Sequence, residues 1–336
     1  MIHNSYSRIN IHSFLSICMI GLFFLFSLWI PSGVSVTDLS PNVIGWFVGN
    51  DIQEFHQVPW NYYTNIRIGN LQVSPNGTAS CEPDSIFQEA LTYSSTHPIQ
   101  IVLGGGNINI TRCSFSSGTY CETLYNTIQS AVRSCGPQVT GIEFDWEWGK
   151  QYINLFGYIS QSHVIGFSSF LDKLQVALGT PYTVSCDVDL YLLPFTRWVA
   201  GWIFQNNPNL YVNTMSYYTP LDCSISHWKR DGWVVHNEWG VPKEQINIGI
   251  GYFSTIRDKH FKIIEEPTWK YLQLECPNIT ETNCICNRTP YVSASMNYKI
   301  GQLIAQQGYR GSFPWAANYD KFQNPLVAHL IHGMNS

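Results

Sequence analysis

The chain alternates short apolar runs with stretches in which apolar residues follow a helical spacing. The short runs are rich in β-branched and aromatic residues, a composition that favours strands over helices. Eight of them predict strands: Val43–Val48, Asn65–Val73, Ile99–Leu103, Val139–Trp148, Tyr182–Asp189, Leu210–Tyr217, Ile246–Phe253 and Gly311–Asn318.

The intervals between these runs predict helices. One apolar stripe at i, i+1, i+4, i+7 and i+8 runs from Leu124 to Val132, and a second runs from Phe167 to Leu178. Gly179 follows the second stripe at the position of a helix stop signal. Eight strands alternating with helices over about 300 residues predict an α/β fold, the (β/α)8 TIM barrel, rather than an open doubly wound sheet.

The longest interval runs from Gly251 to Gly311 and holds three cysteines and two N-x-[ST] sequons. It predicts a disulfide-tied excursion around residues 254–290. Because we find no linker, internal repeat or low-complexity stretch, residues 37–336 are predicted to form a single catalytic domain.

The N-terminus carries an uncharged apolar run, Phe14–Ile30, followed by Pro31 and small residues. This pattern predicts a cleavable signal peptide over residues 1–36 and a secreted or lumenal protein, whether extracellular, lysosomal or vacuolar. An uncleaved signal anchor is the alternative, and only then do we expect contact with a membrane. Without this segment, which holds Arg8 and no acid, 23 acidic and 17 basic residues leave a net charge of −6. A mildly acidic chain without a basic stripe argues against a nucleic-acid partner.

Nine cysteines remain after the signal segment, and four sequons begin at Asn76, Asn109, Asn278 and Asn287. Disulfides are therefore the default interpretation, with one thiol left over. Cys186 is predicted to be that thiol, because Asp187 and Asp189 face inward on the fifth strand and turn Cys186 toward the helices. Local pairs of Cys113 with Cys121, and of Cys276 with Cys284 or Cys286, agree with the spacing, which leaves connectivity open.

The fourth predicted strand contains TGIEFDWEWG, residues 140–149, with three carboxylates on alternate positions. Glu143, Asp145 and Glu147 therefore share one face, and the large apolar residues between them share the other. Since helices cover the outside of a parallel barrel, the acids are expected to point inward, with Glu147 nearest the C-terminal mouth. Adjacent ionised carboxylates repel one another, so at least one is expected to hold a proton near neutral pH.

Three interpretations of these acids compete. They could line a solvated edge strand, or bind a divalent metal together with Asp187 and Asp189, or form an acid/base relay. The opposite apolar face and the central position of the strand favour the relay. We therefore expect neither a metal nor a cofactor.

The segment GIEFDWE resembles the DGxDxDxE signature of family 18 glycoside hydrolases, the chitinase family, at the strand where that family carries it. Other segments resemble family elements in the same order, so the resemblance covers nearly all of residues 42–330. They are Val43–Phe47, Val58–Pro59–Trp60, Val102–Gly105 without the usual serine, Met215–Tyr218, Ile248–Phe253 and Trp315.

The resemblance implies a substrate-assisted retaining glycosidase. Glu147 would protonate the leaving oxygen, Asp145 would hold the acetamido group of the sugar, and Glu143 would support Asp145. Tyr217 would bind the acetamido carbonyl, and Trp315 would lie under the sugar. The other residues expected to bind substrate are Trp46, Gly104, Gly105, Met215 and Tyr218.

The chain departs from the family pattern at three positions: Thr140 and Glu143 replace aspartates of the signature, and Tyr218 replaces the aspartate after Tyr217. Because Asp145 and Glu147 are present, hydrolysis of β-1,4-linked N-acetylglucosamine glycans remains the expected activity. Chitin, chitooligosaccharides and the chitobiose core of N-glycans all fit as partners. The alternatives are a chitinase-like lectin that binds the same sugars with little or no turnover, and a structural or inhibitor protein that reuses the barrel.

Overall fold

A computed structural model gives the fold. It describes residues 41–69, 71–104, 119–146, 161–188, 190, 194–217, 224–254, 256–257, 263–265, 268–276, 285–286, 289–320 and 325–336.

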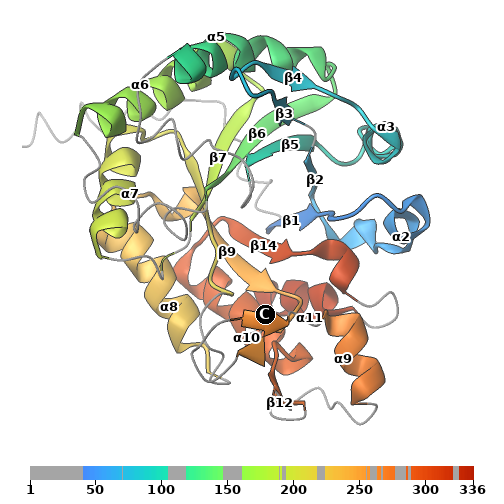
Figure 1. Cartoon of the computed structure of the whole chain (residues 1–336). Coiled ribbons are helices and arrows are strands. Elements are labelled where there is room, and N and C mark those ends of the chain that lie inside the picture. Colours follow the sequence, from blue (N-terminus) through green and yellow to red (C-terminus); the bar gives the residue numbers. More distant parts are fainter. Residues whose placement is uncertain are drawn as a thin grey trace, which may run out of the picture. The chain divides into compact units, whose positions relative to one another are not determined.

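Eight parallel strands close into a barrel, which confirms the predicted (β/α)8 fold (Figure 1). Neighbouring strands in sequence are neighbours in the barrel, and the last strand pairs with the first. In order around the barrel the strands are β1 (Asn42–Trp46), β2 (Asn65–Gly69), β5 (Ile99–Gly104), β6 (Val139–Trp146), β7 (Thr183–Val188), β8 (Tyr211–Thr214), β9 (Ile246–Gly251) and β14 (Gly311–Trp315).

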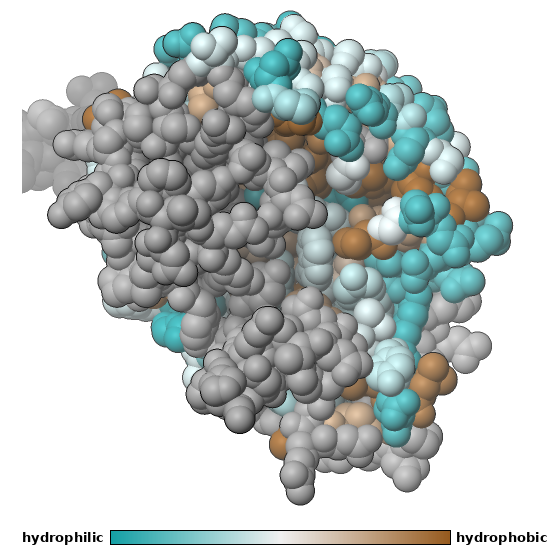
Figure 2. Space-filling model, viewed as in Figure 1, coloured by the Kyte–Doolittle hydropathy of each residue, from teal (hydrophilic) through white to brown (hydrophobic). Residues whose placement is uncertain are grey.

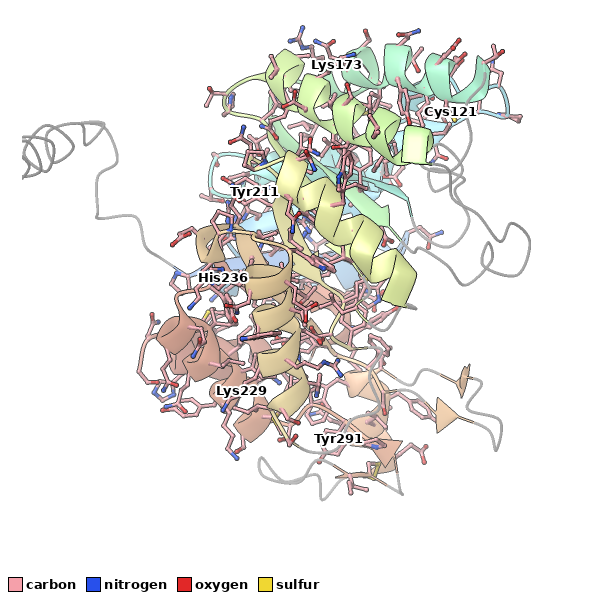
Figure 3. The ribbon with its side chains drawn as sticks, turned by 90° about the vertical axis from the view of Figure 1, so that its left-hand side faces the viewer. Cys121, Lys173, Tyr211, Lys229, His236 and Tyr291 are labelled. Carbon is pink, nitrogen blue, oxygen red and sulfur yellow. A yellow bond between two sulfur atoms is a disulfide. The ribbon has the colours of Figure 1, made fainter. Side chains whose placement is uncertain are left out.

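Helices form the outer layer of the barrel. Figure 3 shows exposed Lys173 and Lys229 on two of them, on the side facing the viewer. Within the described ranges no helix has the length and apolar character needed to cross a membrane. The helices are α2 (Ile52–Gln57), α3 (Ser85–Thr92), α5 (Thr119–Ser134), α6 (Gln161–Leu178), α7 (Pro194–Asn206), α8 (Ser226–Trp233), α9 (Trp269–Glu275), α10 (Ala294–Gln307) and α11 (Leu326–Met334), with short 3-10 or π turns at Trp60–Tyr62, Val234–Glu238, Lys243–Gln245 and Ala317–Tyr319.

The second predicted strand, Asn65–Val73, is wrong in its extent. The barrel strand β2 ends at Gly69, and β3 (Leu71–Val73) instead pairs antiparallel with β4 (Ala79–Cys81). A period-2 pattern gives the direction of side chains but not the partner strand, so it does not reveal this change. The strands predicted to reach Tyr217 and Asn318 end earlier, at Thr214 and Trp315.

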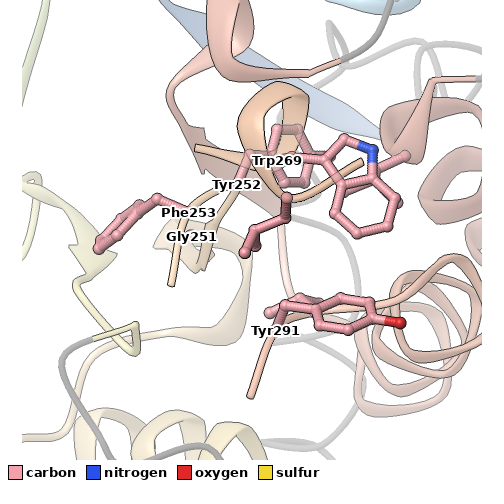
Figure 4. Close-up of a pocket in the computed structure, with 8 residues that line it drawn as sticks. Gly251, Tyr252, Phe253, Trp269 and Tyr291 are labelled. Atoms are coloured by element: carbon pink, nitrogen blue, oxygen red, sulfur yellow. The ribbon is translucent and has the colours of Figure 1, made fainter. Parts of the chain in front are cut away.

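Two apolar layers hold the barrel. The outer layer packs the strands against the helices, as where Phe144 of β6 contacts Phe167 and Phe170 of α6 edge-on. The inner layer fills the upper half of the barrel with aromatic rings, among them Phe253. Figure 4 shows Phe253 and Tyr252 pointing in opposite directions, because alternate residues face opposite sides of the sheet.

The segment between β9 and α10 carries small elements outside the barrel. Trp269 of α9 packs on Tyr291 with 5.2 Å between ring centroids, beside the tight pocket drawn in Figure 4. Cys276 and Cys286 form a disulfide there, so Cys286 is the partner of Cys276 among the two alternatives that the spacing allowed. The strands are β10 (Ile256–Arg257), β11 (Ile263–Glu265), β12 (Ile285–Cys286) and β13 (Thr289–Pro290).

A second disulfide, which the sequence does not predict, joins Cys81 of β4 to Cys135 at the end of α5. Cys121 is also disulfide-bonded, but its predicted partner Cys113 lies outside the described residues. Cys186 is a buried free thiol, as predicted.

The sequon residue Asn76 lies exposed in the turn between β3 and β4, where its side-chain oxygen accepts a hydrogen bond from Thr78 N at 3.0 Å. The sequons at Asn109, Asn278 and Asn287 lie outside the described residues.

Candidate active site

Strand β6 carries two of the three predicted acids into the barrel. Glu143 is 0% exposed and Asp145 is 8% exposed, while Phe144 between them is buried in the outer layer. The inward direction predicted from the alternation is confirmed for these two carboxylates. Glu147, Tyr218 and Gly105 lie outside the described residues, so their predicted roles remain predictions.

Gly104 ends β5 beside Asp145, its partner in the parallel ladder. Its φ of +139° belongs to the backbone region that favours glycine. A Cβ at this position would lie 2.2 Å from the carbonyl oxygen of Asp145 and 3.0 Å from its Cβ. Gly104 therefore marks a close approach of the β5 and β6 backbones.

A cleft of about 330 Å³ opens at this end of the barrel and reaches Asp145. Its wall includes Trp46 and Trp315 from the strands, together with Leu71 and Gln72 from the β3–β4 hairpin. Figure 2 shows brown apolar atoms next to teal polar ones toward the middle of this face. A mixed wall with a carboxylate at its base is suited to a ligand that offers both apolar faces and hydrogen-bonding groups.

Aromatic rings form the inner side of this cleft. Trp315 is half-buried and packs edge-on against Trp46, with 4.4 Å between ring centroids. Trp46 in turn packs on Phe313, at 5.5 Å. The peptide bond between Trp315 and Ala316 is cis. Both predicted tryptophans therefore lie together at the mouth, where a sugar face can stack on an indole ring.

The segment after β8 places Met215 and Tyr217 in the same apolar cluster. Tyr217 is 5% exposed and packs edge-on against Phe253 at 5.5 Å. Gly251 makes room for it, since a Cβ there would lie 2.8 Å from the Cβ of Tyr217. Among the described residues predicted to bind substrate, Gly104, Trp46 and Trp315 line the cleft. Met215 and the predicted catalytic residue Tyr217 do not line it but belong to the apolar cluster that also contains Trp46.

Glu143 is held by three donors from three other strands. Arg67 Nη2 lies 2.8 Å from Glu143 Oε2, and Ser185 Oγ donates to the same oxygen. Asn213 Nδ2 donates to Oε1 at 2.7 Å. Both carboxylate oxygens are thereby engaged, and the charge is paired with a guanidinium in an enclosed site.

A file of amides extends this network to the base of the barrel. Asn247 Nδ2 donates to Asn213 Oδ1 at 2.7 Å, and Asn42 Nδ2 donates to Asn247 Oδ1 at 3.0 Å. Every amide in the file donates toward Glu143, so each hydrogen bond polarises the next in the same direction. The lower half of the barrel is thus polar rather than filled with branched apolar residues.

Asp187 of β7 is the partner of Asp145 in the parallel ladder and is 0% exposed. Among the described residues no donor forms a hydrogen bond with either oxygen of an ionised Asp187, and Arg67 Nη1 lies 3.8 Å from Oδ1. Burial, and then the neighbouring charge of Glu143, raise the pKa of Asp187 well above its usual value. Burial and the neighbouring carboxylate therefore favour the protonated form of Asp187, and a carboxylic acid can donate a hydrogen bond to Glu143.

The sequence interpretation missed Arg67, the cation of this site. A signal was present: Ile66 and Ile68 on either side of Arg67 are apolar, so alternation turns the only base of that run into the barrel. Its guanidinium lies near both Glu143 and Asp187, the place that the alternative metal interpretation assigned to a divalent cation. Asp189, the fourth residue of that alternative, lies outside the described residues.

No family model matches this chain, and neither does any curated protein. Solved structures of chitinases match over nearly the whole barrel. A chitinase from Bacteroides thetaiotaomicron matches with a TM-score of 0.70 at 16% identity, covering 88% of this chain and 96% of that one. The GH18 chitinase ChiB from the chitin utilization locus of Flavobacterium johnsoniae matches with a TM-score of 0.65 at 15% identity, covering 88% and 94%.

A mutant class V chitinase from Nicotiana tobaccum, solved in complex with NAG4, matches with a TM-score of 0.67 at 13% identity, covering 87% of this chain and 98% of that one. At this level of identity the likeness establishes the fold alone. The chain therefore has the GH18 chitinase-like fold, as the sequence predicted.

Proposed function

We propose that this protein is a secreted glycosidase that hydrolyses β-1,4 linkages of N-acetylglucosamine glycans by substrate-assisted catalysis. The observation that carries the proposal is Asp145. Asp145 lies at the base of a cleft with two tryptophans in its wall. In the sequence it precedes the proposed acid Glu147 by two residues. The chitinases that share the fold include one solved with NAG4, which supports an N-acetylglucosamine oligosaccharide as ligand.

In the proposed reaction Glu147 donates its proton to the glycosidic oxygen as the bond to C1 breaks. The acetamido carbonyl oxygen of the substrate attacks C1, giving an oxazolinium ion, and water then opens this ring to restore the sugar. Asp145 accepts a hydrogen bond from the acetamido N–H and stabilises the positive charge that develops. A preorganised carboxylate in a site shielded from water serves this purpose better than one in bulk solvent.

The departures at Thr140 and Glu143 are compatible with this role for Asp145. Thr140 lies at the start of β6, where its hydroxyl contacts Ile99 O at 3.4 Å, several residues away from the cleft. The longer side chain of Glu143 reaches Arg67 and Asn213 across the barrel interior. Neither residue lines the cleft.

The test is release of a fluorogenic aglycone from chitobiose and chitotriose conjugates by the native protein and by Glu147→Gln. We expect turnover by the native protein and a loss of at least about 100-fold in Glu147→Gln, since general acid catalysis contributes about 10²–10⁴-fold. Turnover that the substitution leaves unchanged would contradict the mechanism.

The second candidate function is a lectin with the same barrel. The replacement of the expected aspartate by Tyr218 favours it, because that position contacts the acetamido group in the family that the sequence resembles. Binding of chitooligosaccharides by both the native protein and Glu147→Gln, without turnover by either, would establish the lectin. No binding at all would point to a structural or inhibitor role.

A further inference from the structure

We propose that Arg67 is a positioning residue that keeps Asp145 ionised by neutralising Glu143 directly beneath it. This inference rests on the function proposed above and assigns a role to a residue outside the signature segment. It also adds to the role expected for Glu143, which becomes the ion-pair partner of Arg67 as well as a support for Asp145.

Several contacts hold the side chain of Arg67 in one position inside the barrel. The side chain is 1% exposed, and three of its contacts come from three different strands. Nε donates to Gln100 Oε1 at 2.8 Å, and Nη2 lies 2.8 Å from Glu143 Oε2 and donates to Ser185 Oγ at 3.2 Å. A guanidinium fixed by this many acceptors has one orientation, and that orientation faces the acid strand.

The aromatic side of the barrel closes around the same cation. The guanidinium carbon lies 5.5 Å from the centroid of the Phe313 ring, within the range of a cation–π contact. Phe313 packs on Trp46, which packs on Trp315 at the cleft. Arg67 therefore contacts both the carboxylate of Glu143 and Phe313, the ring on which Trp46 packs.

The charges around Asp145 explain why one cation matters. Glu143 lies two residues earlier on the same face of β6, and Asp187 lies opposite on β7. The groups that face this site from β5, β8 and β9 are the neutral amides Gln100, Asn213 and Asn247.

Two further titratable groups interact with this network. Burial, followed by the charges of Glu143 and Asp187, raises the pKa of the Cys186 thiol well above its usual value, so it stays uncharged. Arg310, the other nearby cation, is stacked on Tyr211 with 3.8 Å from its guanidinium carbon to the ring centroid. The positive charge of Arg67 offsets the negative charge of Glu143 at 2.8 Å, directly beneath Asp145, and the raised pKa of Asp187 favours its uncharged form on the opposite strand.

Removal of Arg67 leaves a buried anion beneath Asp145. An unpaired like charge favours the protonated form of a neighbouring carboxylate. In Arg67→Met, Asp145 would therefore become ionised only at higher pH, and the acid limb of the pH profile of kcat/KM would move upward. Removing both charges, in Arg67→Met/Glu143→Gln, would return the limb toward its native position.

The experiment measures kcat/KM against pH on the fluorogenic chitobiose conjugate for the native protein, Arg67→Met, Glu143→Gln and the double variant. We expect the apparent pKa of the acid limb to be higher in Arg67→Met than in the native protein by about one pH unit or more. This is the lower end of the pKa shifts that a nearby charge causes. The limb of the double variant should lie within about half a unit of the native one. Arg133→Met, which removes an exposed arginine from α5, is the matched control and should not move the limb.

The comparison also works if Arg67→Met does not fold. Glu143→Gln keeps the positive charge of Arg67 but removes the anion that pairs with it. The apparent pKa of the acid limb should therefore be lower in Glu143→Gln than in the double variant, by a similar amount. Reduced activity with an unshifted limb in Arg67→Met, or equal limbs in Glu143→Gln and the double variant, would overturn the inference while leaving the proposed function intact. A native protein without turnover would overturn the proposed function, and this inference with it.

Discussion

Arg67 and Glu143 form an ion pair in the interior of the barrel, with 2.8 Å between Nη2 and Oε2 and with side chains 1% and 0% exposed. They come from β2 and β6, on either side of β5. A barrel interior is ordinarily filled by branched apolar residues. Here a hydrogen-bonded polar network fills the lower half instead, and Asp145, the carboxylate at the cleft, lies directly above it.

Removing one member of this pair should be costly for stability. We expect Arg67→Met to lower the free energy of unfolding by about 3–5 kcal/mol, because it leaves a buried carboxylate uncompensated. The surface pair of Lys270 with Glu54 is the control: its atoms are 3.0 Å apart but its side chains are 36% and 34% exposed. Lys270→Met should cost no more than about 1 kcal/mol. Equal costs in urea unfolding would contradict the structure of the network.

Asp187 predicts a specific dependence of stability on pH. Since its pKa is raised in the folded state, that state binds the proton more tightly than the unfolded chain. The stabilisation is complete below the unfolded pKa of about 3.9 and is lost as the pH rises toward the folded pKa. Asp187→Asn, which keeps the shape and a donor without the charge, should remove this loss.

Urea unfolding at a series of pH values above the unfolded pKa of about 3.9 tests this prediction. The stability of Asp187→Asn relative to the native protein should increase with pH, with a slope approaching about 1.4 kcal/mol per pH unit. The exposed Asp172 provides the control, because Asp172→Asn should show no such slope. A flat difference for Asp187→Asn would mean that Asp187 is ionised in the folded protein.

The disulfide between Cys81 and Cys135 ties the β3–β4 hairpin to the end of α5. Leu71 and Gln72 of this hairpin belong to the wall of the cleft. Replacing both cysteines by serine should lower stability by about 4 kcal/mol for a loop of this length, and should also raise KM for chitooligosaccharides.

The disulfide between Cys276 and Cys286 is the matched control, because it closes a shorter loop and its residues do not line the cleft. Its removal should cost about 3 kcal/mol and leave KM unchanged at temperatures where the variant is folded. An equal rise in KM for both variants would show that the hairpin has no special part in binding.

Cys186 should resist thiol reagents in the native protein. It is 0% exposed, and burial and neighbouring carboxylates raise the pKa of its thiol well above the usual value. The thiolate is the reactive species, so both access and ionisation oppose labelling. Peptide mapping after a short exposure to a maleimide should find Cys186 unlabelled in buffer and labelled in denaturant. Rapid labelling in buffer would contradict its place between barrel and helices.

The fold was predictable from the sequence because eight short strand-like runs are separated along the chain by longer intervals, two of which carry clear helical stripes. The direction of Glu143 and Asp145 followed from the same alternation, since the apolar residues of β6 can be buried only against the helices. The two tryptophans at the cleft were predicted from the family resemblance and not from periodicity, because a single aromatic residue in a strand is found as often in a core as in a binding site.

Other features depend on contacts between distant segments, which local patterns do not encode. The run Asn65–Val73 reads as one strand, although Leu71 leaves the barrel to pair with Cys81. The pairing of Cys81 with Cys135 spans 54 residues, and sequence leaves the connectivity of cysteines open. The ion pair of Arg67 with Glu143 became visible only when β2 and β6 were brought to the same interior.

The most direct test of the central claim is the anomeric form of the first product released from chitotetraose, followed by proton NMR in real time. Substrate-assisted catalysis retains configuration, so the β-anomer should be the initial product and should then mutarotate. Glu147→Gln should release no product on the same timescale. Initial release of the α-anomer would contradict the mechanism, and a native protein that binds the oligosaccharide without cleaving it would contradict the enzyme.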